Sequence, residues 1–188
     1  MALIKSIARV ALGTALLLLI PLVAQQFSAE MAWSPNDFIT AGILLFVAGL
    51  LFVLIARLGD STAYRLAVAL AVGAGLLLIW GNLAVGFIGN EDNPANLLYG
   101  GVLAVALTGA FVARFRPRGM SNAMFAAALT QFLVPVVAAL IWRPEVNMGM
   151  AWVFMLNAVF AGLWVGAGLL FRRATATTGL NPTRQLAS

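Results

Sequence analysis

Residues 80–99 read WGNLAVGFIGNEDNPANLLY. This stretch ends one long apolar run, forms a compact turn rich in acids and amides, and begins the next apolar run. Glu91 and Asp92 within it are the only adjacent acidic residues in the chain. Long apolar runs separated by short polar turns are typical of a polypeptide that crosses a membrane several times.

The composition supports a membrane protein over a soluble domain. Hydrophobic residues make up 63% of the 188 positions, charged residues only 9%, and the mean hydropathy is +1.01. A soluble domain carries about a quarter of its residues as charged side chains. The chain contains no cysteine and no histidine, which excludes disulfides and cysteine-based metal sites and removes the commonest general base. We therefore expect neither a cofactor nor enzymatic activity.

Six apolar runs are long enough to cross a bilayer, which takes about 20 helical residues. They predict an all-α bundle of six transmembrane helices over residues 1–173, followed by a polar, disordered tail at 174–188. The first run follows basic residues as a signal peptide would, but it is long and lacks a good cleavage site, so we expect a retained helix rather than a cleaved one. The predicted spans are 7–27, 35–57, 65–89, 94–114, 121–142 and 150–171.

Two of these runs begin with a capping residue followed by proline, namely Ser34-Pro35 and Asn93-Pro94. Proline suits the first helical position, because the N–H that it lacks has no partner there. Asp37 lies in the first turn of the second run, where a negative charge faces the positive end of the helix dipole. Inside the fifth run, Pro135 is expected to kink the helix.

The charges predict the orientation of the chain. Of the 11 Lys and Arg residues, only Arg143 falls on the opposite side of a six-span chain from the others. Of the acids, only Asp60 shares the side of the basic majority. Because cytoplasmic loops are enriched in Lys and Arg, both termini are expected in the cytoplasm. The basic residues on that side are Lys5, Arg9, Arg57, Arg65, Arg114, Arg116, Arg118, Arg172, Arg173 and Arg184.

Four of the polar side chains inside the predicted spans are candidate site residues. Counted from the outer ends, Asn82 and Asn157 lie about 10 Å deep, Tyr99 about 8 Å and Gln131 about 16 Å. They are candidates for interhelical hydrogen bonds. The alternative is a polar-lined cavity open to the outside, with Trp80 and Trp164 as walls. No ionisable group lies deep in a span, which argues against a proton-coupled pump and leaves a carrier for neutral molecules open.

The acidic turn offers a second candidate site in Glu91, Asp92 and Asn93. Carboxylate and amide oxygens are ligands that calcium prefers, but their spacing does not match a twelve-residue calcium loop. We favour a structural turn in which Asn93 caps the next helix and the acids are solvated. Another alternative is an intramembrane enzyme, which would need Glu91 and Asp92 as its acid–base pair. The two acids could also form an exposed ionic contact with Arg143.

Small residues recur every fourth position in two of the runs. Such faces let helices approach closely in lipid, where packing supplies the drive for association. Packing within the bundle is the favoured interpretation, and a structural or accessory subunit that binds itself or another membrane protein is the alternative. Nucleic acid is not an expected partner, since the basic charge follows the membrane orientation. The small residues that recur every fourth position are Ala67, Ala71 and Gly75 in the third run, and Ala158, Gly162 and Gly166 in the sixth.

Residues 80–99, together with 113–120 (ARFRPRGM), resemble a family of small, uncharacterised bacterial membrane proteins with several spans. The resemblance covers about residues 36–173. It implies a bacterial inner-membrane location and brings no activity or site residue. We therefore expect an integral inner-membrane protein that binds or passes a small neutral or lipid-like molecule between its helices.

Overall fold

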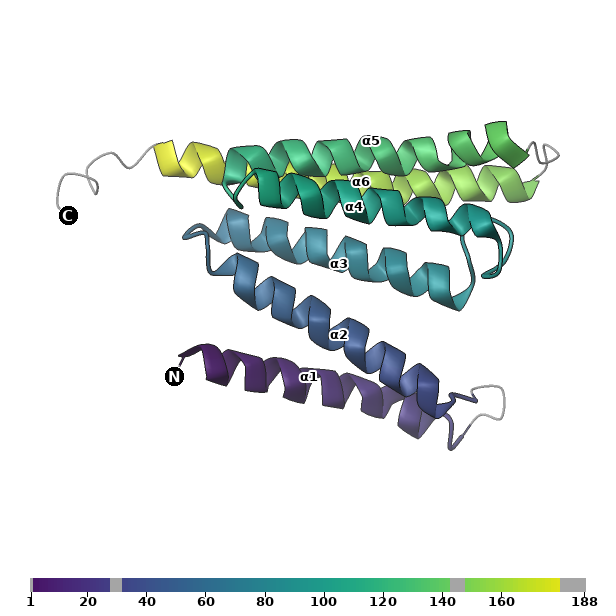
Figure 1. The fold of residues 1–188 in the computed structure, drawn as a ribbon. Helices are drawn as coiled ribbons and strands as arrows, with labels where there is room; N and C mark the ends of the chain where they lie inside the picture. The colour runs from purple at the N-terminus through teal and green to yellow at the C-terminus, as the bar shows by residue number, and fades with distance from the viewer. Residues whose placement is uncertain (1, 28–31, 143–147, 180–188) are drawn as a thin grey trace. The chain divides into compact units, whose positions relative to one another are not determined.

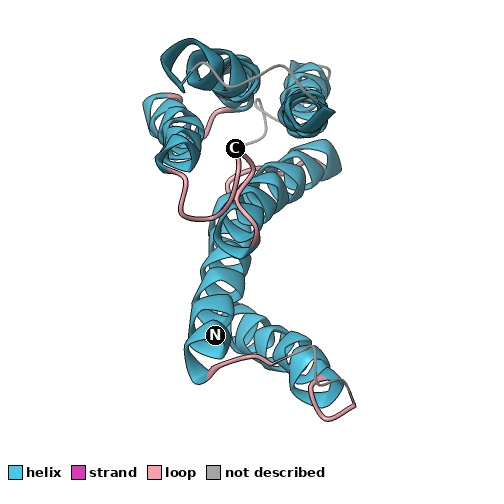
Figure 2. Cartoon of the chain, turned by 90° about the vertical axis from the view of Figure 1, so that its right-hand side faces the viewer, coloured by secondary structure: helices cyan, strands magenta, loops and turns pink. Residues whose placement is uncertain are grey.

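A computed structural model describes residues 2–27, 32–142 and 148–179. Within these ranges the chain is all helix and loop, without strands (Figure 2). Six helices in the described residues are long and apolar enough to span a membrane, counting the short 3-10 turn η1, Pro94–Leu97, with the helix that follows it. This confirms the predicted six-helix architecture, and the chain is a multi-pass membrane protein. The helices are α1 (Ala2–Ala24), α2 (Pro35–Ala56), α3 (Thr62–Ala84), α4 (Leu98–Val112), α5 (Pro117–Trp142) and α6 (Met148–Gly179).

The helix boundaries differ from the predicted spans by five residues or more at three places. α1 begins at Ala2, ahead of the predicted 7–27. α3 ends at Ala84, five residues before the predicted 89, because Gly86 and Gly89 adopt positive φ angles of 65° and 75° that break the helix. α6 continues to Gly179, so 174–179 are helical where a disordered tail is predicted; the rest of that tail, 180–188, lies outside the described residues.

The predicted helix starts are present. The Asp37 backbone N–H donates to Ser34 Oγ at 3.3 Å, and the Ser34 N–H donates back to Asp37 Oδ2 at 2.7 Å. Asn93 Oδ1 accepts from the backbone N–H of Ala95 at 3.0 Å, at the start of η1. Each arrangement satisfies N–H groups that a helix start leaves without a partner. α5 runs continuously through Pro135.

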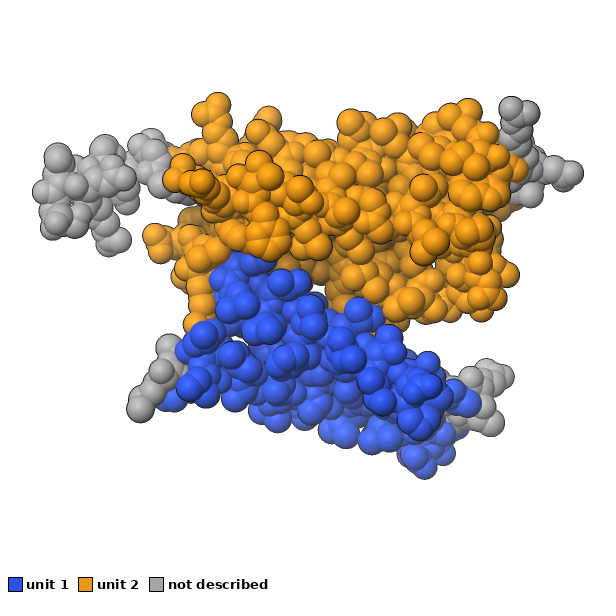
Figure 3. Space-filling model, in the orientation of Figure 1, with its two compact units in different colours: residues 1–55 blue, residues 56–188 orange. Residues whose placement is uncertain are grey.

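The chain divides into two compact units, residues 1–55 and 56–188 (Figure 3). In the first unit α1 and α2 form a hairpin. They meet at Gly49, where an added Cβ would lie 2.6 Å from Val10 Cγ1. Glycine at this position therefore lets the two helices touch.

In the second unit α6 packs against both α3 and α5, and α4 packs against α5 (Figure 1). α4 and α5 approach most closely at two glycines: a Cβ at Gly109 would lie 2.6 Å from the Ala123 Cβ, and one at Gly119 would lie 2.6 Å from the Ala113 Cβ. Trp164 of α6 is 2% exposed, and a Cβ at Gly75 of α3 would lie 3.8 Å from its ring and 3.6 Å from Leu103 of α4. The four helices thus share one core.

The predicted small-residue faces are used only in part for this packing. Ala67 is fully buried, and a Cβ at Gly166 would lie 3.1 Å from Leu70 of α3, so these residues belong to the α3–α6 contact. Ala158 and Gly162 are exposed instead, and a Cβ at Gly162 would meet nothing within 4 Å.

The charged ends of the second unit are separated. Its helices alternate in direction, so the α4–α5 turn with Arg114, Arg116 and Arg118 lies at the end where α3 begins and α6 ends (Figure 1). The α3–α4 loop with Glu91 and Asp92 lies at the other end. The segregation of charge in the sequence is therefore also a segregation in space within this unit.

Candidate functional site

One amide side chain holds the α3–α4 loop, residues 85–93, in place. The Asn96 Oδ1 accepts from the backbone N–H groups of Phe87 at 3.1 Å and Ile88 at 2.9 Å. Its Nδ2 donates to the carbonyls of Ile88 at 3.3 Å and Asn90 at 2.6 Å. Asn96 thus satisfies four backbone groups that have no helical partner. It is absent from the predicted site residues, although an amide just after a glycine-rich turn is a usable indication of such a role.

Glycine is required at one position of this loop. Gly86 has φ +65°, a region that side chains rarely adopt. A Cβ there would also collide with the backbone of Asn90 and lie 2.6 Å from the backbone nitrogen of Glu91. The loop can therefore fold back tightly on itself only with glycine at 86.

Phe87 anchors the loop among three helices. Its ring lies over Gly81 of α3, where a Cβ would collide with it. The ring packs edge-on against Tyr99 of α4 with centroids 5.4 Å apart, and against Phe160 of α6 at 5.3 Å. The loop is thereby fixed by an aromatic cluster at one end and by Asn96 along its length.

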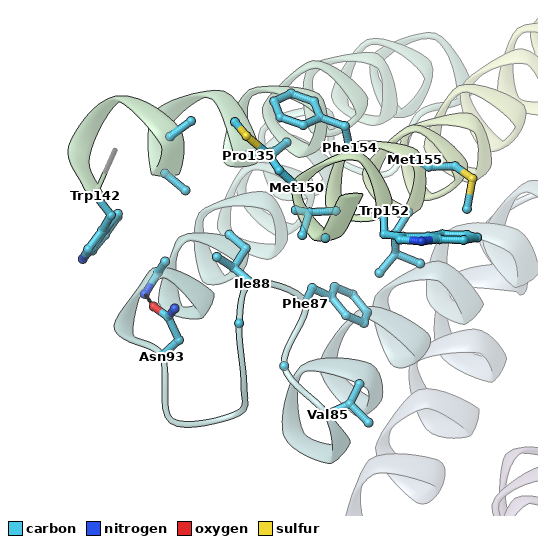
Figure 4. Close-up of a pocket in the computed structure, with 18 residues that line it drawn as sticks. Val85, Phe87, Ile88, Asn93, Pro135, Trp142, Met150, Trp152, Phe154 and Met155 are labelled. Atoms are coloured by element: carbon cyan, nitrogen blue, oxygen red, sulfur yellow. Dashed lines mark hydrogen bonds between the residues drawn. The ribbon is translucent and has the colours of Figure 1, made fainter. Parts of the chain in front are cut away.

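A cavity of about 800 Å³ lies between this loop, the C-terminal part of α5 and the first turns of α6 (Figure 4). Loop side chains such as Phe87 and Ile88 line one side, and Met150 and Trp152 of α6 line the other. Among the described residues that line it, none is charged, and Asn93 carries the single amide. Further lining residues include Val85, Pro135, Ala138, Ala139, Trp142, Val153, Phe154, Met155 and Leu156.

Three of the four predicted polar residues meet in the core. Gln131 Nε2 on α5 donates to Asn157 Oδ1 on α6 at 2.8 Å. Asn157 Nδ2 donates to the Tyr99 hydroxyl on α4 and to the carbonyl of Val153 in its own helix, both at 2.8 Å. Exposure is 2% for Tyr99 and 0% for Gln131 and Asn157. These residues form interhelical hydrogen bonds, as one of the two interpretations predicts.

The fourth polar residue and the predicted walls lie elsewhere. Asn82 Nδ2 donates to the Leu78 carbonyl of its own helix at 2.8 Å, and its Oδ1 is buried without a hydrogen-bond partner. Trp164 is a core residue, and neither it nor Trp80 is among the residues that line the cavity. The tryptophans that line the cavity are Trp142, at the end of α5, and Trp152, near the start of α6. The aromatic walls are therefore not the predicted ones.

The acidic residues are separate from the cavity wall. Glu91 and Asp92 are exposed on the loop, while Asn93 has the predicted capping role. Within the part of the chain that the structure describes, no three His, Cys, Asp or Glu side chains come together. The predicted pairing with Arg143 lies outside the described residues.

The fold and the site together define a multi-pass membrane protein with an apolar cavity, lined by uncharged residues where the structure describes the chain, at one end of its four-helix unit. No protein-family model, curated protein or solved structure matches the chain. The features of the molecule that bear on its function are therefore the cavity and the chain of hydrogen bonds through Tyr99, Asn157 and Gln131.

Proposed function

We propose that this protein binds a small neutral or lipid-like molecule in the cavity and holds or passes it between the helices. The observation that carries the proposal is the cavity of about 800 Å³, whose described lining residues carry aromatic, methionine and aliphatic side chains and no charge. Ligand cavities have about this size, are mostly apolar and contain few polar groups. Such a lining disfavours ions, because burying an unpaired charge is costly.

The walls of the cavity are reachable from the surroundings of the helices. Trp142 is 46% exposed, Trp152 59% and Met155 51%. In a bilayer these side chains would meet lipid, so an apolar molecule could enter sideways without crossing water. This favours an occupant that is itself dissolved in the membrane.

We further propose a bacterial inner-membrane location with both termini in the cytoplasm. The resemblance noted in the sequence supports the location, and the arginines at one end of the second unit support the orientation. In that orientation the cavity lies in the outer half of the bilayer. A catalytic role is not proposed, because its acid–base pair, Glu91 and Asp92, is not among the cavity-lining residues.

Quenching of tryptophan fluorescence by a long-chain bromoalkane tests the proposal. The purified protein in phosphatidylcholine vesicles should show saturable quenching, since bromine in the cavity lies beside Trp142 and Trp152. Ala139→Phe fills the cavity and should abolish the saturable part. Ala126→Phe places the same side chain on an exposed position of α5 outside the cavity and should leave it unchanged. Quenching that never saturates, or that is equal in wild type and Ala139→Phe, rejects the proposal.

A structural or accessory subunit is the second candidate. It is favoured by the open face of α6 at Ala158 and Gly162, since small residues let a second helix approach closely. Purification in a gentle detergent should then yield a complex that Gly162→Leu dissociates. A lone monomer in wild type argues against this role.

A further inference from the structure

α5 and α6 are joined directly at the arginine-rich end of the second unit, where α5 begins and α6 ends (Figure 1). The Ser121 hydroxyl of α5 donates to the Gly168 carbonyl of α6 at 2.8 Å, and a Cβ at Gly168 would lie 3.0 Å from the ring of Phe125. The two helices are antiparallel, so residues that follow Gly168 in α6 lie level with residues that precede Ser121 in α5. Arg172 of α6 and Arg118 of α5 are therefore brought to the same end of this contact.

The guanidinium of Arg172 lies over the ring of Phe125. Its Cζ is 4.9 Å from the ring centroid, and the arginine residue remains exposed. Side chains of a helix tilt toward its N-terminus, and for Arg172 this is the direction of the membrane interior. A guanidinium that lies over an aromatic face still has five N–H donors in its own plane. Arg172 is thus an exposed group of charged donors that an aromatic ring positions beside α5.

α5 carries two further donors on the same face as Phe125. Arg118, Asn122 and Phe125 follow the spacing i, i+4 and i+7, which places them on one side of a helix. Arg118 and Asn122 are exposed, as is Leu129 one turn after Phe125, whereas Ser121 is buried toward α6. This face of α5 therefore looks out of the unit, with polar donors near the helix start and leucine further along.

The start of α5 lies at the depth of lipid headgroups. α5 has 26 residues and is therefore about 39 Å long, about 9 Å more than the hydrocarbon core of a bilayer. Because the helix extends beyond the hydrocarbon, its first turns lie among the headgroups, where the lipid phosphates are. Among the described residues of the second unit, Asp60 is the one acid at this end, and Arg65 and Arg116 add to its positive charge. The local field therefore favours an anion.

We infer that this end of the α5–α6 contact binds the phosphate of an anionic phospholipid, with Arg172 and Arg118 donating to its oxygens and the Asn122 amide donating beside them. Guanidinium groups match phosphate oxygens through parallel N–H bonds. A zwitterionic headgroup would bring its own cation next to two arginines, so a lipid with net negative charge is preferred. A lipid is favoured over a soluble phosphate, because the face continues into exposed Leu129, where acyl chains can pack. The inference does not depend on an occupant of the cavity at the other end.

Native mass spectrometry of the purified protein in detergent, titrated with dioctanoyl phosphatidylglycerol or dioctanoyl phosphatidylcholine, tests the inference. Wild-type protein should bind one phosphatidylglycerol at least about fivefold more tightly than phosphatidylcholine. Arg172→Gln should weaken phosphatidylglycerol binding about fivefold. Phe125→Leu keeps every charge but removes the ring that positions Arg172, and should weaken it about two- to fivefold. Arg65→Gln is the matched control: it removes one exposed arginine from the same end, at the start of α3, and should change the affinity less than about twofold.

Three results would overturn the inference. Equal affinities of the wild-type protein for the two lipids would show that the headgroup charge is not recognised, and this comparison needs no variant. Equal losses in Arg172→Gln and Arg65→Gln, with none in Phe125→Leu, would mean that a general positive field attracts the lipid without a site. Glycerol 3-phosphate carries the phosphate without acyl chains, so displacement of the bound lipid by an equal concentration of it would assign the site to a soluble phosphate instead.

Discussion

Asn157 on α6 donates from Nδ2 to the hydroxyl of Tyr99 on α4 across 2.8 Å, although 58 residues separate the two in sequence. The Oδ1 of the same Asn157 side chain accepts a hydrogen bond from Gln131 Nε2 on α5. One side chain therefore joins three helices next to the cavity. This geometry links the stability of the four-helix unit to the shape of the cavity.

The first prediction concerns this chain of hydrogen bonds. Asn157→Leu should destabilise the protein by about 1–3 kcal/mol, since it leaves the Gln131 amide and the Tyr99 hydroxyl buried without their partner. Adding Gln131→Leu should recover part of the loss, because an apolar pair of similar shape leaves fewer unsatisfied groups. Unfolding in mixed micelles with rising dodecyl sulfate, followed by circular dichroism, measures both. Strictly additive losses would mean that the two side chains are not coupled.

A second prediction concerns the clamp on the loop. Asn96→Ala should remove the hydrogen-exchange protection of the Phe87 and Ile88 amides, which both donate to its Oδ1. Asn96→Asp keeps the accepting oxygen but lacks the Nδ2 group that donates to the carbonyls of Ile88 and Asn90. Hydrogen-exchange protection of the Phe87 and Ile88 amides should therefore persist in this variant. Hydrogen exchange read by mass spectrometry distinguishes the two variants. If both lose protection equally, the carboxamide oxygen is not what holds the amides.

A third prediction concerns the turn at Gly86. Gly86→Ala would put a side chain at a position with positive φ, where its Cβ collides with the backbone of Asn90. The free energy of unfolding should therefore fall by about 1–3 kcal/mol. It should also weaken binding of the bromoalkane, because the loop forms one cavity wall. Gly100→Ala is the matched control: its Cβ would meet nothing within 4 Å, and alanine in a helix is neutral or slightly stabilising. Thermal unfolding curves of the two variants that coincide would contradict this account.

Sequence and structure agree where local chemistry decides the outcome. Apolar runs predict the six helices, and the cap-then-proline pairs predict the starts at Pro35 and Pro94. An amide stands out in an apolar run, so Asn157 and Gln131 could be singled out. Their pairing could not, because it depends on which helices become neighbours and on how each is rotated. That information is not contained in the hydropathy pattern.

The position of the cavity, and its apolar instead of polar lining, could not be predicted from the sequence for a related reason. Its wall is a loop whose path depends on the positive φ of Gly86 and on the four contacts of Asn96. Residues 85–89 look like the end of an apolar helix in the sequence, and a span through 89 would place Phe87 on a helix. The sequence predicts Trp164 as a cavity wall, whereas the structure buries it in the core. Packing between helices has no local sequence pattern that could reveal this.

The last prediction tests the orientation of the second unit. The chain has no cysteine, so single cysteine variants can be labelled without background. Asn90→Cys and Thr62→Cys both replace exposed, uncharged residues, which keeps the charges that set orientation intact. In intact cells a membrane-impermeant maleimide should label Asn90→Cys in the acidic loop and should reach Thr62→Cys, at the arginine-rich end, only after the membrane is opened. Labelling of Thr62→Cys in intact cells would mean that the orientation is the reverse of the proposed one and that the cavity lies in the cytoplasmic half of the bilayer.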